Sequence, residues 1–183
     1  MTEILRDLLA NGADAAPAIS APARPNLSFG ALRALIASTI GQLNALGIGR
    51  NDRVAIVLTN GPEMATCFMA CASGVTSAPL NPAYRADEFE FYLSDLNARA
   101  LIVEQGSTSA AIEVAIKLGV RVLDLIADPQ GAAGNFLLQE RSGTQTTTPT
   151  LSSTTTGGFA QPGDVSMVLH TSGTTSRPKI VPL

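Results

Sequence analysis

The sequence predicts an α/β protein with a doubly wound, mostly parallel sheet flanked by helices. Three observations support this fold class. Short apolar runs alternate with longer stretches that have helical spacing. The run at 52–58 is continuously apolar after its first two residues, as in a strand that is covered on both faces. Hydrophobic residues make up 45% of the 183 positions, which is enough apolar material for a core.

The first helix is expected to begin after Ser28 and to end before Gly47. The Ser28 side chain suits the N-cap because its oxygen can accept a backbone hydrogen bond. Gly47 suits the residue just after the helix, where the backbone often turns left-handed. Between them, apolar residues recur at the spacing of one helix face: Leu32, Leu35, Ile36, Ile40, Leu43 and Leu46.

The alternation continues to residue 125. The strand at 52–58 leads to a helix over 63–73, which Pro62 opens and Gly74 stops. Right-handed crossovers between such parallel strands leave few possible topologies. The other expected elements are strands at 76–80, 100–103 and 120–125 and helices at 87–96 and 109–118.

The composition changes after residue 140. Residues 141–163 are dominated by Thr, Ser, Gly and Gln, so we expect a flexible linker there. The linker would separate an N-terminal α/β subdomain (1–140) from the start of a next subdomain (164–183). In this last part an apolar run at 165–169 predicts a strand with no partner within the sequence. We therefore expect a fragment that exposes apolar surface and self-associates, for example as a homodimer.

Composition and charge exclude several classes of protein. The net charge of −3, without a basic run, argues against nucleic acid as a partner. The apolar segments are too short and too interrupted to span a bilayer. The N-terminus lacks a secretory pattern, so we expect a cytoplasmic protein.

Some residues have side chains that could bind a metal or line a site, but we interpret them as structural. Cys67 and Cys71 are four positions apart in an apolar helical stretch. We interpret them as two small buried thiols rather than metal ligands, because His170 is the only further soft candidate. His170 is interpreted as a packed or loop histidine, and Tyr84 and Arg85 as packing or surface residues.

Residues 171–179 have the composition of a phosphate-binding loop. Gly173 permits positive φ and removes the Cβ that would block a phosphate. Lys179 supplies a positive charge, and Arg177 is a second possible cation. Side-chain hydroxyls next to backbone N–H groups suit a concave anion site, and they belong to Thr171, Ser172, Thr174 and Thr175.

The Walker A loop, G-x-x-x-x-G-K-S/T, is the obvious alternative. Aligning Lys179 with its lysine puts Pro178 at the second glycine and Ile180 at the hydroxyl that binds magnesium. Two of the four fixed positions fail, so Walker A is rejected. The same mismatches argue against a different nucleotide-binding α/β protein such as a phosphotransferase.

The stretch does resemble the signature loop of the adenylate-forming superfamily, whose pattern is close to S/T-S-G-S/T-T-G-x-P-K-G. Ser176 and Ile180 stand where the family usually has glycine, and Ser176 is reminiscent of the oxalate–CoA ligase branch. A β-branched residue resists positive φ, so either the backbone at Ile180 is unstrained or the exit of the loop is altered. The matching residues are Thr171, Ser172, Gly173, Thr174, Thr175, Pro178 and Lys179.

The likeness covers nearly all of residues 27–125. LSFGAL at 27–32 resembles the start of a family helix, and LGIGRNDRVAIV at 46–57 resembles the strand that follows it. NGPE at 60–63 and APLNPAY at 78–84 resemble the next two conserved segments of the family. The resemblance therefore implies the N-terminal part of an acyl-CoA synthetase of the fatty-acid–CoA ligase type.

This resemblance implies a reaction and its partners. In the family a small carboxylic acid attacks the α-phosphate of ATP, and the acyl adenylate passes its acyl group to a thiol, usually that of coenzyme A. The Mg²⁺ ligands and the catalytic lysine are expected downstream, so no catalytic or metal-binding residue is assigned here and the fragment alone should be inactive. A truncated, non-catalytic nucleotide-binding or interaction module stays open as the alternative. The implied ATP-binding residues are Thr171, Ser172, Gly173, Thr174, Thr175 and Lys179.

Overall fold

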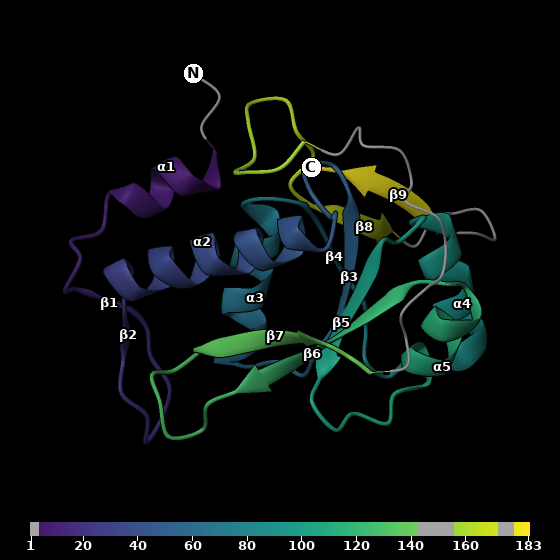
Figure 1. Cartoon of the computed structure of the whole chain (residues 1–183), viewed down its shortest axis with the longest axis horizontal. Helices are drawn as coiled ribbons and strands as arrows, with labels where there is room; N and C mark the ends of the chain where they lie inside the picture. The colour runs from purple at the N-terminus through teal and green to yellow at the C-terminus, as the bar shows by residue number, and fades with distance from the viewer. Residues whose placement is uncertain (1–3, 143–155, 172–177) are drawn as a thin grey trace.

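A five-stranded sheet forms the centre of the molecule (Figure 1). The computed structural model describes residues 4–142, 156–171 and 178–183. The strand order is β4-β3-β5-β6-β7, in which the first four strands are parallel and β7 is antiparallel to β6. This mostly parallel sheet confirms the predicted fold class. The strands are β3 (Arg53–Val57), β4 (Thr76–Pro79), β5 (Ala100–Glu104), β6 (Arg121–Ala127) and β7 (Phe136–Glu140).

Two helices cover each face of the sheet (Figure 1). In β3, Val54 and Ile56 point into the core under one helix pair, while Ala55 and Val57 point into the other core. This alternation explains why a strand with two covered faces appears as an unbroken apolar run. Helices α2 (Phe29–Ala45) and α3 (Pro62–Ala72) cover one face, and α4 (Ala86–Asp95) and α5 (Ala110–Lys117) cover the other.

Helix α2 begins and ends as predicted. The Ser28 side chain accepts a hydrogen bond from the Ala31 amide at 3.2 Å. Gly47 has a φ of 74°, the left-handed conformation expected just after the helix. Over the described residues, no helix combines the length and the apolar character that a membrane crossing requires.

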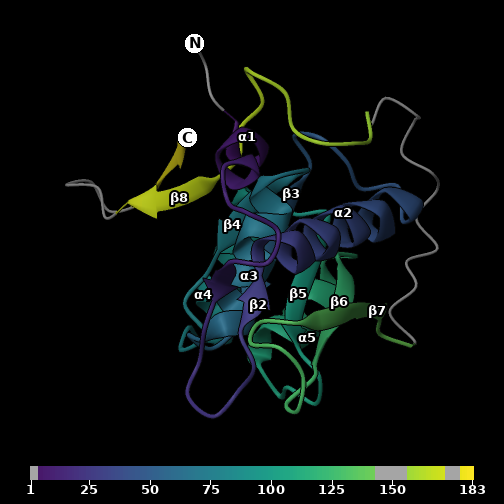
Figure 2. The same cartoon turned by 90° about the vertical axis from the view of Figure 1, so that its left-hand side faces the viewer.

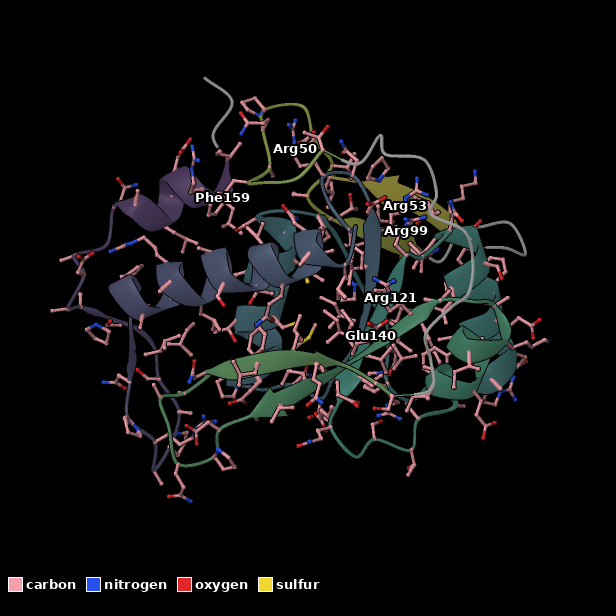
Figure 3. The ribbon with its side chains drawn as sticks, viewed as in Figure 1. Arg50, Arg53, Arg99, Arg121, Glu140 and Phe159 are labelled. Atoms are coloured by element: carbon pink, nitrogen blue, oxygen red, sulfur yellow. The ribbon has the colours of Figure 1, made fainter. Side chains whose placement is uncertain are left out.

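Arginines at the amino ends of the strands bind the carboxyl ends of helices (Figure 3). Arg53 Nη1 donates to the Leu96 carbonyl at 2.9 Å, and Arg121 Nη1 donates to the Leu46 carbonyl at 2.6 Å. Leu96 and Leu46 are the C-caps of α4 and α2, where free carbonyls and the helix dipole favour a cation. These charges therefore have a structural role.

The structure confirms that the two cysteines are buried thiols. Cys67 and Cys71 are free and fully buried in the core beneath α2 and α3. The hydrogen bond with the Cys71 thiol, together with burial, raises the pKa of Cys67 well above its usual value. Cys67 therefore stays a protonated, unreactive thiol at neutral pH.

The sequence did not predict the N-terminal elements or β7. Helix α1 (Leu5–Ala10) and the antiparallel pair β1 (Pro17–Ile19) and β2 (Leu27–Ser28) precede α2. Strand β7 lies at the sheet edge, where Leu137 is 62% exposed. Short strands with one exposed side give a weak sequence pattern, because little of their surface needs to be apolar.

The prediction of a last strand without a partner was wrong. Strand β8 (Val168–Thr171) pairs antiparallel with β9 (Lys179–Pro182). β8 also starts later than expected, because the preceding residues bond to β4: the Val165 carbonyl accepts from Thr76 Oγ1 at 2.7 Å. Sequence missed β9 because its four residues contain one lysine, one proline and only two branched apolar side chains.

A substitution at Gly74, just after α3, tests how closely this end of α3 packs against α2. A Cβ at Gly74 would lie 2.5 Å from Ile40 Cγ1, and Ile40 is buried. We expect Gly74→Ala to lower the free energy of unfolding by about 1–3 kcal/mol through overpacking. Gly41→Ala is the control, because a Cβ there meets no atom within 4 Å. It should raise stability by about 0.5–1 kcal/mol as a helix-interior change. Urea unfolding followed by circular dichroism measures both, and equal effects would contradict this packing.

Candidate functional site: a hairpin at the sheet edge

Strands β8 and β9 form a hairpin beside the β4 edge of the central sheet. Ser77 of β4 forms a parallel bridge with Met167, and its amide donates to the Ser166 carbonyl at 2.9 Å. Figure 2 shows the hairpin extending outward from this side of the sheet. The hairpin is thus rooted on the β4 edge of the sheet.

The hairpin brings the first and last predicted site residues together. Thr171 lies directly opposite Lys179. Directly opposed residues of an antiparallel pair project from the same side, so the Thr171 hydroxyl and the Lys179 ammonium share one side of the hairpin. Both residues are exposed. The other predicted site residues, Ser172, Gly173, Thr174 and Thr175, lie outside the described residues, as does Ser176.

The opposite side of the hairpin is packed. Val168 is buried in the core beneath α4 and α5, and Ile180 packs against the same core. Ile180 is an extended strand residue, which is the conformation that β-branched side chains prefer. Among the described residues, positive φ values outside glycine occur only at Ala23, Asn51 and Asn97. The backbone at Ile180 is therefore unstrained, and the missing glycine needs no altered loop exit.

His170 is a packed histidine, as the sequence indicated. Its Nε2 lies 3.2 Å from Asp95 Oδ2, and its side chain is only 6% exposed. The imidazole also meets the Tyr92 ring edge to face, with 4.6 Å between ring centroids. A carboxylate can only accept, so this hydrogen bond forms in the tautomer of His170 with a proton on Nε2.

Tyr92, which contacts His170, stacks on Tyr84. Their rings stack with centroids 4.8 Å apart. The hydrogen bond with Tyr84, together with burial, raises the pKa of Tyr92 to about 12, so the phenol is neutral at physiological pH. This packing confirms the structural interpretation of Tyr84.

An ion pair holds the segment before the hairpin to the turn before β3. Arg50 Nε donates to Asp164 Oδ2 at 2.6 Å, and Arg50 Nη2 donates to Oδ1 at 3.1 Å. Such two-point pairing fixes orientation as well as distance. The Asp164 side chain is only 9% exposed, and the Arg50 hydrogen bond lowers its pKa to about 2. Asp164 is therefore ionised at neutral pH.

Asn51 completes this clamp, which we define as Arg50, Asn51 and Asp164. Asn51 Nδ2 donates to Asp164 Oδ1 at 2.9 Å, and Asn51 Oδ1 accepts from the Val165 amide at 3.0 Å. Asn51 has a φ of 66°, a conformation that asparagine tolerates better than most residues. Sequence reasoning missed the clamp, because Arg50 and Asp164 are 114 positions apart and no local pattern joins them.

Residues 156–163, which precede the clamp residue Asp164, run along the core beneath α2 and α3. The Thr156 carbonyl accepts from the Arg50 amide at 2.9 Å, and the Ala160 amide donates to the Ser73 carbonyl at 2.8 Å. Phe159, labelled with Arg50 in Figure 3, packs against this core. Residues 143–155 of the expected linker lie outside the described residues, so the division into subdomains stays a prediction.

A second candidate site lies at the carboxyl ends of β3, β5 and β6. The chain runs from β3 to β4 on one side, while β5 lies on the other, and ligands often bind at such a switch point. A cavity of about 400 Å³ opens there. Among the described residues that line it, Glu63 and Glu104 are carboxylates and none is a lysine or arginine. Carboxylates without a cation in the described lining do not favour a polyphosphate ligand, so the hairpin with Lys179 stays the candidate for phosphate binding.

Comparison with known proteins decides the family. The sequence matches the AMP-binding enzyme family over residues 9–183. The chain belongs to this family. It is 36% identical over 159 residues to the probable CoA ligase CCL9 of Humulus lupulus, covering 86% of this chain and 29% of that protein. It is 35% identical over 187 residues to the oxalate–CoA ligase of Arabidopsis thaliana, covering all of this chain and 35% of that protein. The chain thus spans about a third of the length of these relatives.

Solved structures agree on the fold of this AMP-binding family member. Apo MatB from Rhodopseudomonas palustris superposes with a TM-score of 0.72 at 23% identity, over 100% of this chain and 35% of MatB. The o-succinylbenzoate CoA synthetase MenE from Bacillus subtilis, in complex with AMP, gives a TM-score of 0.65 at 21% identity, over 99% of this chain and 42% of MenE. The fold is therefore that of the N-terminal domain of acyl-CoA-synthetase-like structures.

Asp164→Asn tests the clamp. The variant should lose about 1–3 kcal/mol of unfolding free energy at pH 7, because hydrogen bonds to a charged acceptor are lost. The pKa of Asp164 is about 2 when folded, against about 3.9 when unfolded. A lowered folded pKa gives stability that is complete above about pH 4 and is lost as the pH falls toward 2.

Wild type and Asp164→Asn should therefore converge in stability between about pH 4 and pH 2. Denaturant unfolding at a series of pH values measures this. Asp14→Asn is the matched control, since Asp14 forms an exposed ion pair with Arg33 and should cost less than about 1 kcal/mol. A difference between wild type and Asp164→Asn that stays constant down to pH 2 would contradict the clamp.

Proposed function

We propose that this chain is the ATP-phosphate-binding part of an ATP-dependent carboxylate–CoA ligase of the acyl-CoA synthetase type. In the first step a carboxylate oxygen bonds to the α-phosphorus of ATP, the bond from that phosphorus to the β-bridging oxygen breaks, and pyrophosphate leaves. In the second step the thiol sulfur of coenzyme A bonds to the acyl carbon. AMP then leaves, and the thiol proton passes to solvent.

The observation that carries this proposal is the opposition of Thr171 and Lys179 across the hairpin. Negative charge builds up on pyrophosphate as it leaves, and a fixed ammonium and hydroxyl can stabilise it. Lys179 would neutralise charge, and Thr171 would donate a hydrogen bond to a phosphate oxygen. We propose that Ser172, Gly173, Thr174 and Thr175 complete the contact, and that residues outside this sequence hold Mg²⁺ and coenzyme A.

The proposed acid is a small carboxylate, with oxalate as the first candidate. Two oxalate–CoA ligases are each 35% identical to the chain over the matched residues. Ser176 also follows the pattern that is reminiscent of this branch. The other relatives include a long-chain-fatty-acid–CoA ligase and a 3-hydroxybenzoate–CoA ligase, each 29% identical. Fatty and aromatic acids therefore belong in the same substrate panel.

Two further parts of the proposal concern the chain by itself. The alternative is a truncated, non-catalytic nucleotide-binding or interaction module; Ile180 lies in β9 as an extended strand residue and so does not favour that alternative. We propose that the 183-residue chain alone is inactive and self-associates, and that the ligase acts in the cytoplasm. The two free, buried cysteines suit such a reducing compartment.

Lys179→Ala tests the proposed function in the ligase that contains this chain. Carboxylate-dependent exchange between ATP and labelled pyrophosphate should fall by about 100-fold, as when one stabilising donor is removed from a transition state. Lys117→Ala is the matched control, because Lys117 lies exposed on α5 and pairs with Glu90. It should leave the exchange rate unchanged. The proposal fails if the wild-type protein shows no exchange with oxalate or with any other acid in the panel.

A further inference from the structure

The far end of the hairpin has its own contact with helix α4. Val168 and the Ser77–Met167 bridge hold the base of β8. Nearer the tip, His170 reaches Asp95 and Tyr92 of α4. His170 directly precedes Thr171, and its cross-strand partner Ile180 directly follows Lys179. A contact at His170 therefore acts on both exposed residues of the proposed phosphate site.

Asp95 stands where a helix by itself disfavours a carboxylate. It is the last residue of α4, at the negative end of the helix dipole. The hydrogen bond with His170 gives this carboxylate a partner across the chain, 75 positions away. The imidazole donates to this carboxylate when Nε2 carries a proton.

Tyr92 restricts the position of the imidazole. Its ring meets His170 on one side and stacks on Tyr84 on the other. Tyr84 in turn packs edge to face on the fully buried Phe89, with centroids 5.8 Å apart. The contact with His170 is thus supported from the core outward by a continuous set of rings.

We propose that His170 and Asp95 are positioning residues, which hold the hairpin against α4 and so place Thr171 and Lys179 for the phosphates of ATP. This inference rests on the proposed ligase function. We assign the pair no contact with ATP or with the carboxylate. Its role is to fix the end of β8, so that the hydroxyl and the ammonium are already in place when ATP arrives.

Kinetics of the complete ligase test the proposal. His170→Phe keeps a ring against Tyr92 but removes the donor, and Asp95→Leu removes the acceptor. Each should raise KM for ATP by about tenfold and leave KM for the carboxylate unchanged. The double variant should be no worse than either single variant, because both remove one contact. Asp95→Asn retains an acceptor oxygen and should stay within about twofold of wild type. Asp87→Asn, an exposed change in the first turn of α4, is the control and should have no effect.

Hydrogen–deuterium exchange of the same proteins without ATP gives an independent measurement. Peptides covering 168–171 and 179–182 should exchange faster in His170→Phe and Asp95→Leu, while peptides of β3 should be unchanged. Additive kinetic losses, equal effects on both KM values or unchanged hairpin exchange would overturn the positioning role. A wild-type protein without ligase activity would instead refute the proposed function, and the exchange data would still decide whether the pair holds the hairpin.

Discussion

The ion pair between Arg50 and Asp164 is the contact on which the position of the hairpin depends. It joins the turn before β3 to the segment before β8, across 114 positions of sequence. A carboxylate as little exposed as Asp164 is costly unless it is paired, so the pair with Arg50 favours this position of the segment. Once Asp164 is placed, Val165 and Ser166 follow it directly onto β4. The pair therefore specifies where the chain goes more than it adds stability.

The second constraint is the two-residue period of the hairpin strands. Val168, His170 and Ile180 occupy the packed side, which leaves Thr171 and Lys179 on the exposed side. A slip of one residue in β9 would turn Ile180 toward water and Lys179 toward the core. Burial of these side chains thus decides which side of the hairpin faces solvent.

The features that sequence predicted correctly are local ones. The caps Ser28 and Gly47 act within a few residues, and the parallel strands reveal themselves because both of their faces are apolar. β9 was not predicted because it becomes a strand only by pairing with β8. The clamp was not predicted because its partners are distant in sequence. For the site, composition indicated phosphate binding at 171–179, whereas the opposition of Thr171 and Lys179 could only come from the structure.

The crevice beyond β3 and β5 is lined by carboxylates, whereas the hairpin at the sheet edge carries the lysine of the proposed phosphate site. In the crevice beyond β3 and β5, Glu63 forms an ion pair with Arg24 and Glu104 accepts from the Thr59 amide, so these carboxylates brace the loops of the sheet. Contacts outside this crevice set the place of the hairpin. They include the clamp before it, the bridge to β4 at its root and the contact of His170 with α4. Val168 and Ile180 also pack against the core beneath α4 and α5, so the placement of Thr171 and Lys179 is tied to the folded sheet.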